Sequence, residues 1–420
     1  MPRMDTNKQQ VAVTGGGIAG MAVALALARA GWQPVVFEQA PVLAEVGAGV
    51  QLGPNVTRIL RAWGLQEALM ASACTPSFLN ARRADTGEVL GRLDLQAMTQ
   101  RYGAPYVSIH RADLHRLLLN AAQAQGVQLR LDHSVQAWQQ DATAVRATVK
   151  VSSDTGQPIH NEVHAQWGVV ADGVWSHSRQ TLLGDAPATW TGHLAYRALI
   201  AMDDLPPTLH AALRSKDVNV WMARGMHLVC YPVSAGRQLN VVCLVKADWP
   251  AGVGDVQSWS LHKTEAQTRT DLQLALRGAC AALHQLIDAG HGWRLWPLHG
   301  RTPMQGAHEH VQGRIALVGD AAHPMLPYLA QGAGMAIEDA AALAHAVGLH
   351  ASATPTGISD GLNAFAHNRW QRNARVQQRA MRNGEIFHAA GVMRMGRDWG
   401  LRALGGAVMD VPWLYGYVSP

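Results

Sequence analysis

The sequence predicts a mixed α/β fold, in which a parallel strand-helix-strand unit carries an inserted antiparallel β-sheet and is followed by a mainly helical segment. Three observations predict it. The first 38 residues contain a strand, a glycine turn, a helix and a second strand. Residues 190–296 show the period-two alternation of antiparallel strands, and residues 351–420 have mainly helical patterns. We therefore expect a discontinuous first domain with a sheet domain inserted into it.

Length and composition exclude several classes of protein. The 420 residues are 48% hydrophobic and 15% charged, so the chain can bury a large core. The net charge is only +5, and the sequence contains no run of Lys or Arg, which argues against a nucleic-acid partner. The four cysteines form no CxxC pair and the histidines have no ligand spacing, so no metal is expected. Without a signal-peptide pattern or a long apolar run, we expect a cytoplasmic protein with no stable membrane insertion.

The first unit is a Rossmann-like nucleotide-binding motif. "QQVAVT" and "PVVFE" read as strands, and "MAVALALARAG" between them reads as a helix. The turn "GGGIAG" supplies GxGxxG at Gly15, Gly17 and Gly20, which allow a tight turn, backbone approach to a pyrophosphate and close helix packing. Glu38 ends the second strand, where an acid accepts hydrogen bonds from a ribose. The motif predicts dinucleotide binding and leaves NAD and FAD open.

The remaining patterns set the expected domain boundaries. "VNVWMA", "MHLVCYPV" and "QLNVVCLVK" alternate like strands of an antiparallel sheet. We expect the nucleotide-binding domain in residues 1–75, 101–185 and 300–350. The substrate-binding sheet is expected in residues 76–100 and 186–299, and the helical segment in residues 351–420.

Three segments together resemble a known family. "GGGIAG" with its glutamate, "VVADGVWSHSR" and "GDAAHPMLPYLAQGAGMAIEDA" occur in this order. They are similar to the single-component FAD-dependent aromatic hydroxylases, the para-hydroxybenzoate hydroxylase fold, over nearly the whole chain. "YVSIHRADLHRLL", "GHLAYRALI", "WRLWPL" and "WLYGY" look like the salicylate, 3-hydroxybenzoate and 6-hydroxynicotinate hydroxylase branch in particular.

This resemblance implies FAD as the dinucleotide and assigns residues to it. It implies that Asp320 accepts a hydrogen bond from the FAD ribitol, that Asp172 lies near the pyrophosphate and shares in NAD(P)H binding, and that Arg111 lies against FAD. Alone, each has an ordinary structural explanation as a turn or a helix-terminal residue. The expected cofactor-binding residues are Gly15, Gly17, Ile18, Ala19, Gly20, Glu38, Gln51, Arg111, Asp172, Asp320, Pro327, Gly332, Ala333 and Gly334.

The resemblance also implies a reaction cycle. NADH or NADPH reduces FAD, O₂ gives a flavin C4a-hydroperoxide, and an electron-rich aromatic ring attacks the distal oxygen. The protein must promote loss of the phenolic proton, for which His193 is the first candidate. Tyr196 and Tyr328 are candidates for the lining of the substrate site. His227 and Gln51 are weaker candidates, and His323 is expected to position the backbone.

Several alternatives stay open at this point. The favoured substrate is a small aromatic acid of the salicylate or 3-hydroxybenzoate type, and the alternative is a hydroxylase or epoxidase of the same fold with a heteroaromatic or larger substrate. A second alternative is an FAD-binding redox protein without hydroxylase activity. A two-dinucleotide reductase would need a second GxGxxG and often a cysteine pair, and the sequence has neither. The nicotinamide preference and a monomeric or homodimeric state are left open.

Overall fold

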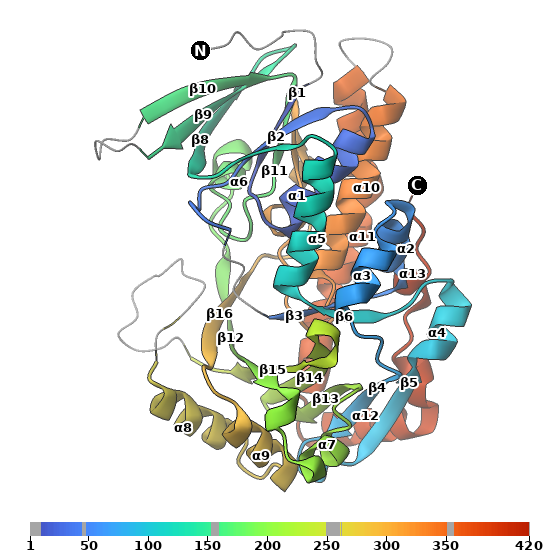
Figure 1. Cartoon of the computed structure of the whole chain (residues 1–420). Helices are drawn as coiled ribbons and strands as arrows, with labels where there is room; N and C mark the ends of the chain where they lie inside the picture. The colour runs from blue at the N-terminus through green and yellow to red at the C-terminus, as the bar shows by residue number, and fades with distance from the viewer. Residues whose placement is uncertain are drawn as a thin grey trace.

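The computed structural model describes residues 10–43, 48–152, 159–248, 261, 263–350 and 357–419, and Figure 1 shows its arrangement. The predicted first unit is present as β1 (Gln10–Thr14), α1 (Ile18–Arg29) and β2 (Gln33–Phe37). These strands belong to a six-stranded sheet of order β17-β18-β11-β1-β2-β7, parallel except for the β17–β18 pair. Its other strands are β7 (Gln128–Arg130), β11 (Trp167–Val170), β17 (Val311–Gln312) and β18 (Ile315–Leu317).

The two faces of this sheet have different partners. Val11 and Val13 of β1 face a core shared with α1, α5 (Arg111–Ala124) and α10 (Gly332–His350). Their neighbour Ala12 faces the opposite core, because successive side chains of a strand alternate. That core is covered by a three-stranded antiparallel sheet, which Figure 1 shows beside the parallel one. Its strands are β8 (His133–Gln140), β9 (Val145–Val151) and β10 (Ile159–Ala165).

The inserted sheet has seven strands in the order β16-β12-β15-β14-β13-β4-β5. Its pairs are antiparallel except β13–β4, which is parallel. The α/β fold class with an inserted sheet is therefore confirmed, while the domain boundaries remain our proposal. The strands are β4 (Phe78–Arg83), β5 (Val89–Asp94), β12 (Thr189–Ala201), β13 (Val218–Ala223), β14 (Met226–Val233), β15 (Gln238–Lys246) and β16 (Arg294–Gly300).

Helices that the alternation pattern did not indicate interrupt this insert. α7 (Pro207–Leu213), α8 (Glu265–Ala275) and α9 (Ala281–Ala289) bury leucines against one face of the seven-stranded sheet. A capping box starts α8: the Thr264 hydroxyl accepts from the Gln267 backbone N–H, and the Gln267 side chain accepts from the Thr264 N–H. The opposite face of the seven-stranded sheet carries the candidate active site described below.

Short elements connect the two sheets. β3 (Gly49–Leu52) pairs with β6 (Val107–His110) in a small antiparallel sheet. The connecting helices are α2 (Pro54–Ala62), α3 (Gln66–Ser72), α4 (Leu95–Tyr102) and α6 (His177–Leu183).

The helical segment joins the parts of the molecule. α11 (Gly357–Phe387) runs beside α10 and continues toward the seven-stranded sheet, followed by α12 (Gly391–Leu404) and α13 (Pro412–Tyr415), as Figure 1 shows. Within the described residues, we find no helix with the length and apolar character needed to traverse a lipid bilayer.

Candidate active site

The glycine turn between β1 and α1 is shaped by close backbone contacts. Gly15 has φ +94°, and a Cβ there would lie 2.3 Å from the main-chain oxygen of Ala171. A Cβ at Gly20 would lie 1.8 Å from the oxygen of Gly15, so the first and third glycines are required by packing. A Cβ at Gly17 would meet no atom within 4 Å. The backbone beside Gly17, at the start of α1, is therefore open to a phosphate group.

Glu38 lies at the end of β2 and is held by the turn itself. Its Oε2 accepts a hydrogen bond from the Gly16 N–H at 2.6 Å, and its Oε1 accepts from Ala40 at 2.8 Å. His115 contributes from α5, with its Nε2 2.6 Å from the Gly16 oxygen. The carboxylate thus stabilises the loop, and its half-buried position leaves it accessible for the predicted ribose contact.

The second motif lies against the first. Asp172 follows β11, and a Cβ added to Gly15 would come 3.0 Å from its Cα. Burial raises the pKa of Asp172. Its Oδ1 is buried and has no hydrogen-bond partner among the described residues. A buried carboxylate oxygen without a partner is unusual, and it fits a site where a bound group supplies the missing donor.

The third motif brings Asp320 to the same edge of the sheet. Asp320 follows β18, and its Oδ1 is 3.9 Å from the position of a Cβ on Gly332, the first residue of α10. Burial raises the pKa of Asp320, while His323 and Arg111 oppose the rise. The three sequence motifs and the start of α5 therefore meet at one edge, and the residues there fit a dinucleotide such as FAD.

Other predicted cofactor residues have roles in packing. Ile18 and Ala19 start α1, and a Cβ on Gly319 would lie 2.8 Å from the Ala19 methyl. Gly334 packs against α2, because a Cβ there would lie 2.9 Å from Val56. Gln51 in β3 is buried and accepts a 2.5 Å hydrogen bond from the Tyr106 hydroxyl.

A histidine cluster, which we define as His193, His227, His388 and Tyr328, forms the second part of the site. His193 comes from β12, His227 from β14, and His388 directly follows α11. The Tyr328 ring is 5.7 Å from His193, 5.1 Å from His227 and 5.7 Å from His388, measured between ring centroids. Nδ1 of His227 lies 2.9 Å from Nε2 of His388. The sequence suggested three members of this cluster and missed His388.

Polar atoms in the histidine cluster lack protein partners. The Tyr328 hydroxyl and Nδ1 of His193 are buried and make no hydrogen bond to the residues that the structure describes. Burial lowers the pKa of all three imidazoles, to about 4 for His388, and raises the pKa of Tyr328. The cluster is therefore a set of neutral donors and acceptors with unused hydrogen-bonding capacity.

Tyr196 is separated from this cluster. Its side chain packs in the core beneath α8 and α9, and its hydroxyl donates to Asp271 of α8 at 3.1 Å. Ala195, its neighbour, packs with Tyr328 on the opposite face. Because strand residues alternate, His193 shares the face of Ala195, and the structure does not bring Tyr196 to the site.

Arg197, on the same face of β12, was missed by the sequence analysis. Its guanidinium carbon lies 3.9 Å from the centroid of the Trp296 ring. Burial lowers the pKa of Arg197 to about 10, and the nearby Arg111 contributes. Nε of Arg197 has no hydrogen-bond partner among the described residues, and the titratable groups that act on its charge there are Tyr231 and Arg111, with no carboxylate among them. A half-buried cation without a counter-ion attracts an anionic ligand.

The DG motif is connected to the segment after β18 through Arg179 of α6. Its guanidinium donates to the main-chain oxygens of Ala321 and Ala322 and pairs with Glu309 at 2.6 Å. Beside it is a surface pocket with a volume of about 410 Å³, lined in part by Arg179, Arg301 and His308. Nε and Nη2 of Arg301 have no partner among the described residues, whereas its Nη1 lies 3.7 Å from Asp185, so this pocket offers unused hydrogen-bond donors.

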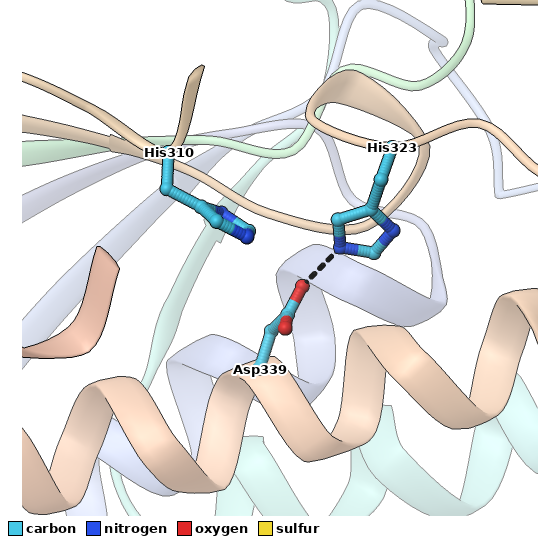
Figure 2. Close-up of side chains that lie close together, drawn as sticks. All are labelled: His310, His323 and Asp339. Atoms are coloured by element: carbon cyan, nitrogen blue, oxygen red, sulfur yellow. Dashed lines mark hydrogen bonds and ion pairs between the residues drawn. The ribbon is translucent and has the colours of Figure 1, made fainter. Parts of the chain in front are cut away.

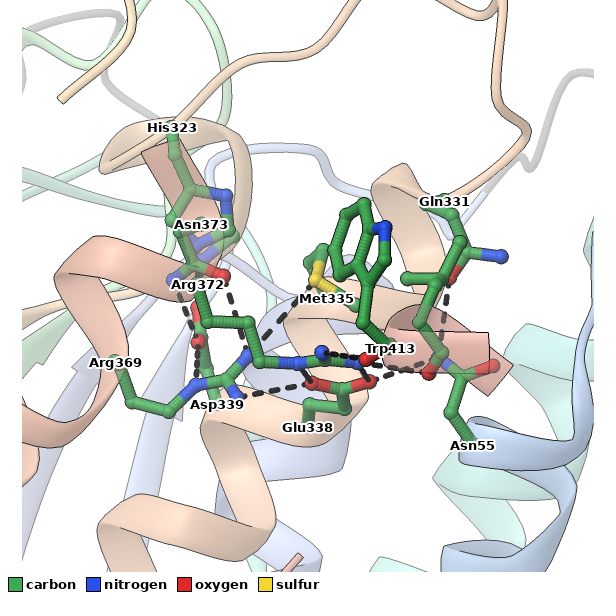
Figure 3. Close-up of polar contacts among 12 residues, drawn as sticks. Asn55, His323, Gln331, Met335, Glu338, Asp339, Arg369, Arg372, Asn373 and Trp413 are labelled. Atoms are coloured by element: carbon green, nitrogen blue, oxygen red, sulfur yellow. Dashed lines mark hydrogen bonds and ion pairs between the residues drawn. The ribbon is translucent and has the colours of Figure 1, made fainter. Parts of the chain in front are cut away.

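A buried ionic network joins α10 and α11, and Figure 3 shows its side chains. Arg369 of α11 donates to Glu338 and Asp339, both at 2.9 Å, and all three are 0% exposed. Arg372 donates to Glu338 at 2.7 Å and to the main-chain oxygens of Trp413 and Leu414. The network thus fixes α10 to α11 and to the segment around α13.

Figure 2 shows the buried group of His310, His323 and Asp339, whose ligand atoms are close enough for a metal ion. Nε2 of His323 lies 2.5 Å from Asp339, and Nδ1 of His310 lies 2.9 Å from the Leu317 oxygen. The Arg369 guanidinium already neutralises Asp339. These side chains already have hydrogen-bond partners, and the Arg369 guanidinium already supplies a positive charge, so the arrangement does not fit a metal ion. That the protein binds no metal stays a prediction.

Comparisons with known proteins agree with this geometry. Residues 8–380 match the model of a family described as FAD binding domain. The chain is 35% identical over 415 residues to 3-hydroxybenzoate 6-hydroxylase of Polaromonas naphthalenivorans (strain CJ2), covering 97% of this chain and 96% of that protein. It is 33% identical over 377 residues to 6-hydroxynicotinate 3-monooxygenase of Bordetella bronchiseptica (strain ATCC BAA-588 / NCTC 13252 / RB50), covering 88% and 90%.

A solved structure described as a salicylate hydroxylase substrate complex has a TM-score of 0.77 and 26% identity, with 99% of each chain covered. The relatives match this chain over almost their full length, so the resemblance extends across both sheets and the helical segment. The chain belongs to the family of FAD-dependent aromatic hydroxylases, and it is an FAD-dependent aromatic monooxygenase.

Proposed function

We propose that this monooxygenase consumes NADH or NADPH and hydroxylates a small aromatic acid that carries a ring hydroxyl. The observation that carries the proposal is the half-buried, uncompensated Arg197 on the face of β12 that also presents His193. A carboxylate or phenolate would supply the anion that Arg197 lacks. Names of relatives, 3-hydroxybenzoate 6-hydroxylase and 6-hydroxynicotinate 3-monooxygenase, support this class of substrate.

FAD, when bound and reduced, supplies the activated oxygen for the hydroxylation. Gly17 and the start of α1 would hold the pyrophosphate, and Asp320 a ribitol hydroxyl. Arg111 would lie close enough to Asp320 to balance its charge. We infer that the remaining predicted cofactor residues, including Pro327 and Ala333, also line the FAD-binding site.

The histidine cluster would act on the substrate hydroxyl. A neutral imidazole accepts a proton, and a phenolate ring is a better nucleophile than a phenol. His227 is better placed than His193 for this role, because it is held by a hydrogen bond to His388 at 2.9 Å. His193 and Tyr328, which have unused polar atoms, would orient the hydroxyl.

For the nicotinamide co-substrate, we propose the surface pocket beside Arg179. Nε and Nη2 of Arg301, which have no partner among the described residues, would donate hydrogen bonds to a pyrophosphate, and Arg179 links the pocket to the main chain of Ala321. The cytoplasmic location and the monomeric or homodimeric state remain predictions.

The test is oxidation of NADH and NADPH by FAD-loaded protein in air, with salicylate, 3-hydroxybenzoate, 4-hydroxybenzoate and 6-hydroxynicotinate added singly and the products identified. We expect one acid to stimulate oxidation and to yield a hydroxylated product. Stimulation only by a larger or heteroaromatic compound would favour the alternative substrate class. Oxidation that never yields a hydroxylated product would support a redox protein.

Arg197→Met tests the anchoring role in the same assay. We expect KM for the acid to rise about tenfold to a hundredfold, because the variant removes the cation that pairs with the ligand charge. FAD should stay bound. Arg224→Met is the matched control, since Arg224 is exposed in the turn between β13 and β14. An unchanged KM in Arg197→Met would remove this arginine from the substrate site.

A further inference from the structure

His388 connects the buried part of the histidine cluster with solvent. Its Nε2 lies 2.9 Å from Nδ1 of His227. His227 is 1% exposed, whereas His388 is only half-buried beyond the end of α11. The backbone holds His388 in place, because its carbonyl accepts from the Gly225 N–H at 3.2 Å. Two imidazoles in series thus extend from the interior to the surface.

The free nitrogen atoms of the pair have the arrangement that a relay requires. An imidazole can accept a proton at one nitrogen while it donates from the other. Nδ1 of His227 is engaged with His388, and Nε2 of His227 makes no hydrogen bond to any residue in the described part of the chain. Nε2 is therefore the atom available to a substrate hydroxyl.

The groups around the pair keep both rings neutral. His193 from β12 and Lys246 from β15 face them, and Tyr328 and Phe387 pack against His227. Burial, His388 and His193 lower the pKa of His227, and burial, His193 and Lys246 lower that of His388. With no stable imidazolium at pH 7, neither ring retains a proton that it receives.

We propose that His388 is a positioning residue that directs Nε2 of His227 toward the substrate and passes the phenolic proton onward to solvent. The inference rests on the proposed function. In the step, the substrate O–H bond breaks and an N–H bond forms at Nε2 of His227. The N–H at Nδ1 of His227 breaks as one forms at Nε2 of His388, and the proton on Nδ1 of His388 leaves to water.

Proton release upon binding is the direct test, and it needs no turnover. Oxidised, FAD-loaded protein is mixed with 3-hydroxybenzoate in weakly buffered solution containing a pH indicator, without a nicotinamide. Benzoate, which has no hydroxyl, is the blank. We expect the parent protein to release a proton, and His388→Gln to release it about tenfold more slowly or worse with unchanged affinity. Glutamine can hold His227 but cannot pass a proton through itself.

Chemical rescue separates proton transfer from a purely structural role. Imidazole added to His388→Ala should restore the rate of proton release, whereas it should not affect the parent protein. His367→Gln is the matched control, because His367 is an exposed histidine on α11 whose Nδ1 contacts only its own helix. We expect that control to behave like the parent protein.

The outcomes distinguish the inference from the function. Equal release rates in the parent and His388→Gln, with no effect of imidazole, would overturn the relay and leave the hydroxylase intact. Hydroxylation of a tested acid without proton release would do the same. If none of the four acids of the functional assay is hydroxylated and none releases a proton, the function and the relay both fail.

Discussion

The guanidinium of Arg179 donates a hydrogen bond to the main-chain oxygen of Ala322. Arg179 belongs to the helix that follows the DG motif, and Ala322 to the segment that leads from β18 to α10. Two motifs 143 residues apart in sequence are thus fixed to each other by one side chain. The same arginine pairs with Asp185 and Glu309, so its charge is compensated.

Replacing Arg179 by methionine should loosen both motifs. Glu309 would lose its ion-pair partner, and removing one member of a buried ion pair destabilises a fold by about 3–5 kcal/mol. We expect a lower midpoint of thermal unfolding and faster loss of FAD, followed by flavin fluorescence. Arg294→Met, at an exposed position of β16, is the control. Retention of FAD equal to that of the control would show that the link is dispensable.

Asp320→Asn should weaken FAD binding without unfolding the chain. The carboxylate oxygen is close to the first residue of α10, and an amide accepts a hydrogen bond less strongly than a carboxylate. The measurement is the dissociation constant of FAD by fluorescence quenching, which we expect to rise about tenfold. The exposed Asp203→Asn serves as the control. If the variant binds FAD as tightly as the parent protein, Asp320 does not contact the FAD ribitol.

His193→Ala should slow hydroxylation while FAD remains bound. The imidazole has an unsatisfied Nδ1 next to Tyr328, and we expect kcat to fall about a hundredfold if it orients the substrate hydroxyl. Product formation per NAD(P)H consumed is the quantity to compare with His367→Ala. Unchanged turnover would exclude His193 from the mechanism.

The contribution of the buried ionic network between α10 and α11 to the stability of the protein can be measured. Arg369→Met leaves Glu338 and Asp339 without their 0% exposed partner, and should lower the free energy of unfolding by about 3–5 kcal/mol. Urea denaturation measures the change. Arg382→Met, at an exposed position of the same helix, should change it by less than about 0.5 kcal/mol. Similar values for the two variants would mean that the network contributes no net stability.

His310 makes the stability depend on pH in a defined window. Burial lowers its pKa from 6.5 to about 4, so between these values the unfolded chain binds a proton that the native state does not. The free energy of unfolding should therefore fall as the pH falls from 6.5 to 4, by about 1.4 kcal/mol per pH unit from this residue. Urea unfolding at pH 5 and pH 7 should show a smaller difference in His310→Gln. An equal difference would assign the dependence to other groups.

Local signals in the sequence predicted most of the fold. The glycine turn, the strands around it and the late GDAAHP segment carry their information in a few adjacent residues, and they form the edge that the resemblance indicated. The helices α8 and α9 were not expected, although Thr264 and Gln267 form a capping-box pattern in the sequence. The flanking segments alternate like strands, so the whole region was interpreted as antiparallel sheet.

The substrate side of the site was less accessible from sequence. Tyr196 and His193 are three residues apart on one strand. Because side chains alternate along a strand, this odd spacing already placed them on opposite faces of the sheet. His388 and Arg197 depend on contacts between distant segments, and neither has a local pattern. Glu338 and Asp339 lie in an apolar helix and pair with Arg369, but no local pattern in the sequence distinguishes Arg369 from the other arginines.

The contacts of Arg372 with the carbonyls of Trp413 and Leu414 affect the order in which the protein can be assembled during synthesis. The first nucleotide-binding unit is complete in sequence by residue 38, long before those two residues have left the ribosome. The charges beneath α10 gain their last partners only when residues 413 and 414 emerge. A stable holoprotein is therefore expected to form after translation has passed the C-terminal segment, and truncations upstream of Trp413 should produce chains that capture the cofactor poorly.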